Sequence, residues 1–288
     1  MLALIVETMR PRQWTKNAFV LAGLVFSGMA LEPAAQLRAW TMAAAFCLAS
    51  GAAYLLNDAA DAETDRHNPR TAGRPVARGE LSRRAARSAA GVATLLALGL
   101  ALLVNWESLA VLGGFIVLQV AYSGGLKHAL FLDIMIIAGG FVLRALAGLV
   151  AIDALISEWL LLCTGLLALF LGLAKRRGEV VALGGIAHPH RPVLEHYSLV
   201  LLDELIAVVT PAILVVYALY AITGAQAGRI MLVTLPFVLY GIFRVLYLIH
   251  HSSGMTEEPE VVVWKDGPLL ACILLWGVSA GVISVLAV

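Results

Sequence analysis

The sequence has little charge and little cysteine, and both shortages narrow the classes of protein to which it can belong. Charged residues make up 14% of its 288 residues, whereas 61% are hydrophobic and the mean hydropathy is +0.89. A soluble domain carries about 25% charged residues, so an ordinary soluble protein is excluded. The three cysteines are isolated and lack metal-ligand spacing, and we therefore expect no disulfide and no thiolate metal site.

Two further absences bear on location. The chain lacks short segments of alternating polar and apolar residues, which argues against an outer-membrane barrel. It also lacks the pattern of a signal peptide, because Glu7 and Arg10 interrupt the first apolar stretch and no small-residue cleavage site follows. We therefore expect the first apolar run to remain in the mature protein.

Long apolar runs fill most of the chain. Runs of about 20 residues with almost no charge can cross the hydrocarbon core of a bilayer as helices. Nine such runs cover approximately residues 17–31, 36–57, 85–104, 108–124, 130–151, 157–174, 199–222, 230–250 and 268–287. The sequence predicts an all-α integral membrane protein with nine transmembrane helices, built as one polytopic domain over residues 1–288.

The positions of the basic residues predict the orientation. With a cytoplasmic N-terminus, 16 of the 20 Lys and Arg lie in cytoplasmic segments, and only Arg38 and Arg229 lie in outside loops. Because positive charge is retained on the cytoplasmic side, we expect a cell-membrane protein with a cytoplasmic N-terminus and an outside C-terminus. Three longer cytoplasmic segments, 58–84, 175–198 and 251–267, are expected to form a cap of loops over a cavity in the bundle.

The strongest chemical signal is a group of acidic residues at the end of the second apolar run. On a helix, Asp58, Asp61 and Asp65 fall within roughly 60° of one another, and Asn57 lies one turn before Asp61. Carboxylates this close repel one another beside lipid, whereas a hard divalent cation that also binds phosphate would compensate them. The pattern predicts a Mg²⁺ site at these four residues. The alternative is a solvated acidic helix end.

A basic segment follows the acidic group directly. Arginines recur at Arg66, Arg70 and Arg74, and Pro69 and Pro75 favour turns there. A guanidinium group matches the geometry of phosphate oxygens, so these three arginines are candidate phosphate ligands. The alternative is simple retention of positive charge on the cytoplasmic side, which does not explain the adjoining aspartates.

The order Asn-Asp-x-x-Asp-x-x-x-Asp-Arg, followed by Asn-Pro and Arg-Pro, resembles the first aspartate motif of the UbiA-type intramembrane prenyltransferase superfamily. Three further segments resemble its decaprenyl-phosphate phosphoribosyltransferase branch: Arg10–Asn17, Tyr122–Lys127 and Phe141–Gly148. The resemblance implies a nine-helix UbiA-like bundle. It also implies Mg²⁺-dependent transfer of 5-phosphoribose from phosphoribosyl diphosphate to a polyprenyl (decaprenyl) phosphate, with release of diphosphate, in a pathway that leads to cell-envelope arabinan.

This chain departs from ordinary prenyltransferases of the superfamily at their second aspartate motif. The corresponding loop begins Lys175-Arg176-Arg177-Gly178-Glu179 and has no second carboxylate cluster. Cations there favour binding of an additional phosphate, so we assign Lys175, Arg176 and Glu179 to the substrate site. The alternative is that they are ordinary cytoplasmic loop charges.

Charged residues within the apolar runs add to the predicted site. Asp133 and Arg144 lie about three helical turns apart on nearly the same face of one run, and an Arg in mid-membrane normally faces the bundle interior. Both are expected to line the substrate site, and a purely structural ion pair between helices is the alternative. Lys127 is expected to bind phosphate. Tyr122 is expected to bind ribose or phosphate, or else to belong to an interfacial aromatic belt.

Under the resemblance, Lys16 and Asn17 also bind a substrate phosphate or diphosphate at the mouth of the bundle. The residues expected to act directly in the reaction are Asp58, Asp61, Lys127 and Arg144. The predicted partners are phosphoribosyl diphosphate, a polyprenyl phosphate and the bilayer; no nucleic acid is expected, and a homo-oligomer is left open. Two alternatives are a prenyltransferase that joins a polyprenyl diphosphate to a small acceptor and a membrane transporter.

Overall fold

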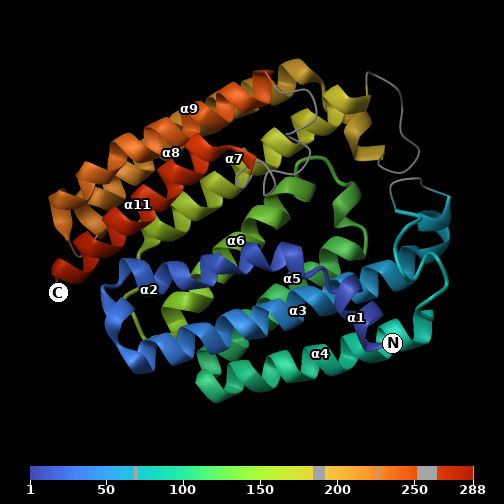
Figure 1. The fold of residues 1–288 in the computed structure, drawn as a ribbon. Helices are drawn as coiled ribbons and strands as arrows, with labels where there is room; N and C mark the ends of the chain where they lie inside the picture. The colour runs from blue at the N-terminus through green and yellow to red at the C-terminus, as the bar shows by residue number, and fades with distance from the viewer. Residues whose placement is uncertain (68–70, 184–191, 226, 252–264, 288) are drawn as a thin grey trace.

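The protein is a helical bundle in the computed structural model, which describes residues 1–67, 71–183, 192–225, 227–251 and 265–287. Within these residues the regular structure is entirely helical. Among these described residues, eight helical segments are long and apolar enough to cross a membrane, and they run roughly side by side (Figure 1). Their main helices are α3 (Pro33–Arg66), α4 (Arg83–Val104), α5 (Trp106–Ser123), α6 (Leu132–Ala151), α7 (Glu158–Leu183), α8 (Leu199–Leu219), α9 (Leu235–His251) and α11 (Gly267–Leu286).

The first of the nine predicted spans differs from a regular long helix. After the short helix α1 (Leu2–Thr8), the chain forms the 3₁₀ segment η1 (Pro11–Leu21) and the short helix α2 (Ala22–Phe26). This segment packs against α6 at very short range, since a Cβ on Gly148 would lie 1.7 Å from the carbonyl oxygen of Val20. Only glycine permits that backbone approach, which small residues commonly provide between membrane helices.

Two apolar cores flank α6. One joins α3, α4, α5 and α6 around Phe46 and Phe115, with a row of alanines on α4 buried against the bundle. The other joins α6, α7, α8 and α9 around Phe170 and Leu202. The chain termini lie at opposite ends of the bundle (Figure 1). The three cysteines, Cys47, Cys163 and Cys272, are free thiols on separate helices.

Two predicted loop segments are shorter than expected because the flanking helices continue into them. Helix α3 extends to Arg66, so the acidic group lies on a helix, as its spacing predicted, and Arg66, which was expected in the loop, is also helical. Helix α7 extends to Leu183, so Lys175, Arg176 and Glu179 lie on a helix and were wrongly placed in a loop. The Arg176 to Glu179 ion pair, one turn apart, stabilises this continuation. The predicted phosphate ligand Arg70 lies outside the described residues.

Candidate functional site

The candidate site is built along one face of α3. Ser50, Tyr54, Asp58, Asp61 and Asp65 follow one another at intervals of three or four residues, so their side chains share a face of the helix. We call this row the polar lane. It runs from the acidic end of α3 into the apolar bundle. Side chains from other parts of the chain make hydrogen bonds and ion pairs with it.

Two arginines hold the buried carboxylates of the lane. Asp58 is 1% exposed, and it accepts hydrogen bonds from Arg10 at 2.6 Å and from Arg74 at 3.2 Å. Arg74 also donates to Asp65 at 2.7 Å. Arg10 precedes η1 and Arg74 belongs to the loop after α3, so two segments distant in sequence neutralise one pair of aspartates. Charge-assisted bonds of this length are strong.

The third carboxylate is more accessible. Asp61 has a side chain that is 36% exposed, and it pairs with Lys127 at 3.4 Å. Lys127 lies on η3 (Leu126–His128), between α5 and α6. The predicted proximity of the aspartates, Arg74 and Lys127 is therefore present in the structure.

Beyond the carboxylates, the lane continues through neutral polar groups. The Tyr54 hydroxyl donates to Gln13 Oε1 at 2.6 Å, and Lys16 Nζ donates to the same oxygen at 3.4 Å. Arg10 also lies over the Tyr54 ring, 4.6 Å from its centroid. Gln13, Tyr54 and Arg10 were not among the predicted site residues. Two features of the sequence could have indicated them. Arg10 and Gln13 belong to the Arg10–Asn17 segment, and Tyr54 lies one helical turn before Asp58.

Arg144 closes the deep end of the lane. Its guanidinium donates to Asn17 Oδ1 at 2.8 Å, to the Gly140 carbonyl at 2.9 Å and to Ser50 Oγ at 3.4 Å. The rings of Phe46, Phe115 and Phe141 surround it at centroid distances of 5.9, 4.6 and 5.2 Å. No carboxylate in the described part of the chain lies within ion-pairing distance of this group. A buried cation compensated only by dipoles and rings makes this end of the lane attractive to an anion.

Asp133, predicted to share a site with Arg144, belongs to a separate network. Asp133 is fully buried and pairs with Arg176 at 2.8 Å, while Arg176 also pairs with Glu179 at 2.5 Å. The Tyr197 hydroxyl donates to Asp133 at 2.9 Å. Burial, together with the hydrogen bond to Asp133 and its negative charge, raises the pKa of the Tyr197 phenol. These four side chains satisfy one another and join α6, α7 and the segment before α8.

Several predicted residues have other surroundings. Arg66 donates to the Ala77 carbonyl at 2.9 Å and to Glu63 at 3.2 Å, so it braces the loop after α3. Tyr122 lies at the end of α5. Lys175 has partners of its own and lies on α7.

The donors present fit a magnesium ion chemically. Asn57 and the lane carboxylates offer only hard oxygen atoms, as Mg²⁺ prefers, and Asp61 leaves room for water or phosphate. In the described ranges no three acidic, His or Cys side chains are already grouped as a metal site. Instead, arginine and lysine cations lie on the carboxylates, so a metal would take positions that these cations now hold.

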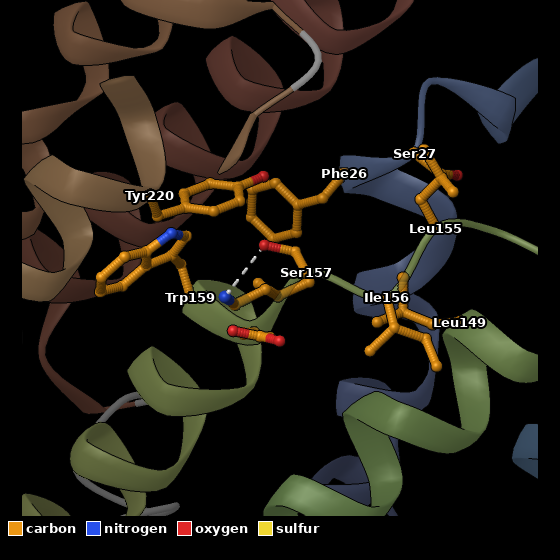
Figure 2. A pocket seen from close by; sticks show the side chains of 10 residues that line it. Phe26, Ser27, Leu149, Leu155, Ile156, Ser157, Trp159 and Tyr220 are labelled. Atoms are coloured by element: carbon orange, nitrogen blue, oxygen red, sulfur yellow. Dashed lines mark hydrogen bonds between the residues drawn. The ribbon is translucent and has the colours of Figure 1, made fainter. Parts of the chain in front are cut away.

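A separate cavity of about 400 Å³ lies near the junction of α6 and α7. Figure 2 shows Phe26 and Tyr220 together on one side of it, with Leu149 and Ile156 on the other. Because α6 begins near Lys127 and ends at this cavity, about 30 Å of helix separates it from the lane carboxylates. It contains none of the lane residues, and we assign it no part in the chemistry.

Comparison with known proteins adds independent information. The family model described as the UbiA prenyltransferase family matches residues 17–261. A decaprenyl-phosphate phosphoribosyltransferase of Mycolicibacterium smegmatis is 33% identical over 94% of this chain and 89% of that protein. A protein of the same name from Corynebacterium glutamicum is 32% identical over 94% of this chain and 84% of that protein. A UbiA homologue from Archaeoglobus fulgidus, solved with GPP and Mg²⁺, matches the fold with a TM-score of 0.76 at 16% identity, over 98% of this chain and 99% of that chain.

Proposed function

The chain belongs to the UbiA prenyltransferase family and is a multi-pass membrane transferase, and from this premise we propose that it transfers 5-phosphoribose from phosphoribosyl diphosphate to a polyprenyl phosphate such as decaprenyl phosphate. The observation that carries the proposal is the polar lane, which brings three carboxylates and the cations Arg10, Arg74 and Lys127 together at one end of an apolar bundle. That combination suits a metal-bound diphosphate beside further phosphate groups. The names of the relatives supply the sugar and the lipid.

The carboxylate end of the lane would receive the diphosphate. Asn57, Asp58, Asp61 and Asp65 would hold Mg²⁺, which when bound supplies positive charge to neutralise the leaving diphosphate. Lys127 and Arg74, which now pair with these aspartates, lie where they can bind phosphate oxygens instead. Arg66, Arg70 and Tyr122 would contribute further contacts around the same group.

The deep end of the lane would orient the anionic acceptor. A polyprenyl phosphate is already negatively charged at neutral pH, so no general base is needed and positioning governs the rate. Lys16 and Asn17 lie on η1, with Arg144 bonded to Asn17 at 2.8 Å. We assign Arg144 the task of holding Asn17 and of contributing positive potential in a low-dielectric site. The isoprenoid tail would leave between helices into lipid.

The network of Asp133, Arg176, Glu179 and Tyr197, which we call the second network, would hold this site in position. Its buried pair, Asp133 and Arg176, would not contact substrate. Asp133 and Arg176 are 0% and 4% exposed in their side chains, and Glu179 is bonded to Arg176. Lys175 alone of the predicted α7 residues would then serve the 5-phosphate or the acceptor phosphate. We further propose that η1 and α2 make the ninth membrane crossing, with the lane carboxylates and the N-terminus on the cytoplasmic side of the cell membrane.

The test uses the purified protein in liposomes that contain decaprenyl phosphate. Labelled phosphoribosyl diphosphate with Mg²⁺ is expected to yield a labelled phosphoribosyl lipid, identified by mass spectrometry. A parallel reaction receives a labelled prenyl diphosphate and aromatic acceptors, because the family as a whole is described as prenyltransferases. Label entering only the prenylated acceptor would replace the proposal by that alternative, and flux of intact substrate without product would indicate a transporter.

A further inference from the structure

Arg10 makes the shortest cation contact with the lane, at 2.6 Å from Asp58. It lies outside the aspartate motif, which begins at Asn57. It is also one of three residues other than glycine with a positive φ in the described chain, at 54°. An L residue in this left-handed region is strained. From this backbone conformation the guanidinium reaches Asp58 at 2.6 Å; the Arg10 side chain is 24% exposed and the Asp58 side chain is 1% exposed.

The short helix before Arg10 is fixed to α3 by close packing. A Cβ on Gly51 would lie 2.5 Å from Met9 Cε, so Met9 fills the space that this glycine leaves. The indole of Trp14 donates to the Met9 carbonyl at 3.2 Å. Glu7 of α1 pairs with Arg78, in the loop between α3 and α4, at 3.6 Å. Leu4 and Ile5 of α1 also pack against the cluster that contains Met9, while Leu2 and Val6 are exposed on the opposite side.

We propose that Arg10 is an exchangeable counter-cation: it neutralises Asp58 in the unloaded enzyme and moves to a phosphate oxygen when the metal and diphosphate bind. The reason is charge balance. Asp58 is buried, so its charge is costly without a cation, and Arg10 is the closer of its two arginine partners. A divalent ion at Asp58 would repel a guanidinium 2.6 Å from the same carboxylate. A diphosphate brings negative charge to the same place, and Arg10 needs only a change at its strained backbone to reach it.

The inference deepens the proposed function, because it requires a diphosphate substrate and not a particular sugar. It makes Arg10 a substrate-binding residue of the site. Arg10 lies between α1 and η1, so its movement would also affect α1. A purely structural Arg10 would behave differently. Its removal would loosen the site and weaken the binding of every ligand.

Binding measurements on Arg10→Gln in detergent separate the two roles. Mn²⁺ alone is expected to bind roughly tenfold more tightly to the variant, the scale of one charge-assisted hydrogen bond, because the closer of the two arginines that compete for Asp58 is gone. Inorganic diphosphate in the presence of saturating Mn²⁺ is expected to bind roughly tenfold more weakly, because a phosphate ligand is gone. Opposite signs support the proposal, whereas equal signs or no change would overturn it.

Two variants provide the controls. Arg78→Gln removes another arginine that touches α1 but reaches none of the lane carboxylates, and both affinities should stay as in the unmodified protein. Gly51→Ala pushes Met9 and displaces α1 without changing any charge, so Mn²⁺ should bind a few-fold more tightly, in the same direction as in Arg10→Gln. An unchanged Mn²⁺ affinity in Gly51→Ala would contradict the part assigned to α1.

Hydrogen exchange on the unmodified protein tests the movement without any variant. Amides of residues 2–10 should exchange faster when Mn²⁺ and diphosphate are both present than in their absence, because release of Arg10 removes one of the contacts that hold this segment against α3. Equal or slower exchange would overturn the exchange of partners. These readouts need no turnover. If phosphoribose transfer failed while the opposite binding signs held, the proposed substrate would be wrong and the role of Arg10 would stand.

Discussion

The two ionic networks of the bundle use the same residue types in different ways. In the polar lane, the cations Arg10, Arg74 and Lys127 are 24% to 28% exposed and come from the junction between α1 and η1, a loop and a short 3₁₀ turn. In the second network, Arg176 is 4% exposed and lies within α7. The first network opens to solvent through short segments, while the second is enclosed between long helices.

The difference separates exchangeable charges from fixed ones. A partly exposed cation on a short segment can leave its carboxylate because water and a new anion can replace the bond. A buried cation enclosed by two carboxylates cannot, because breaking the pair leaves charge in a low dielectric. This difference supports the proposal that substrate binds at the lane, while the Asp133 network joins α6, α7 and the segment before α8.

The largest effect should come from the lane. Asp61→Asn removes a carboxylate that is accessible to a metal-bound diphosphate, and we expect a loss of roughly a thousandfold in transfer rate, about 4 kcal/mol in transition-state free energy. The melting temperature in detergent should stay within about 2 °C, since Asp61 is 36% exposed and its bond to Lys127 is long. Phosphoribose transfer into lipid and thermal unfolding measure the two quantities. Full activity, or an unfolded variant, would remove Asp61 from the site.

The second network should give the reverse result. Asp133→Asn leaves Arg176 with one carboxylate partner in place of two, and we expect the free energy of unfolding to fall by about 3 kcal/mol. Residual folded protein, assayed below its melting temperature, should keep transfer activity within about tenfold. Asp153→Asn is the matched control, because it breaks an exposed pair with Arg38 and should change stability little. A stable but inactive Asp133→Asn would place this residue in the substrate site.

The sequence predicted the lane better than the second network, because the lane aspartates are close in sequence while the partners of Asp133 are not. Asp58, Asp61 and Asp65 lie on one helix, so periodicity alone brings them to one face. The partners of Asp133 lie 43 and 64 residues away, and no local pattern pairs Asp133 with Arg176 in preference to Arg144. Packing between helices decided that choice. The same holds for Arg10, which reaches Asp58 from 48 residues away.

Hydropathy also predicted most of the membrane-spanning helices, with one exception. The eight later runs correspond to the eight segments in the described ranges that are long and apolar enough to cross a membrane. The first run instead begins within the 3₁₀ segment η1, whose backbone at Val20 lies in close contact with Gly148 of α6. Apolar content predicts that a segment is buried or in lipid, but it does not distinguish a 3₁₀ segment from an α-helix.

A smaller effect should distinguish the cations within the lane. Lys127 reaches only the exposed Asp61, at 3.4 Å, so Lys127→Gln should cost roughly tenfold in transfer rate, about 1.4 kcal/mol. The loss should appear mainly in KM for phosphoribosyl diphosphate if Lys127 binds the ground-state phosphate. Lys127→Arg keeps the charge and should restore most of the affinity. Equal losses in both variants would show that the position, and not its charge, matters.

The smallest effect concerns an ion pair outside both networks, between α9 and the start of α11. Asp266 accepts from Arg244 at 2.8 Å and from the Leu269 amide at 2.9 Å. The hydrogen bond from Arg244, helped by that amide and by the charge of Arg244, lowers the pKa of the Asp266 carboxyl despite the opposing effect of burial. A lowered folded-state pKa stabilises the fold above the unfolded value of about 3.9, and this contribution disappears as the pH falls through the folded-state pKa.

The melting temperatures of the unmodified protein and Asp266→Asn should therefore differ by a few degrees from pH 7 down to about pH 4, and the gap should close at lower pH. The Asp153→Asn control should show a small gap at every pH, because its partner Arg38 is 45% exposed and water screens the pair. A gap for Asp266→Asn that persists unchanged at pH 3 would mean that the ionised carboxylate does not stabilise the start of α11. In that case the helix cap alone, which an asparagine can also supply, would account for the geometry at this position.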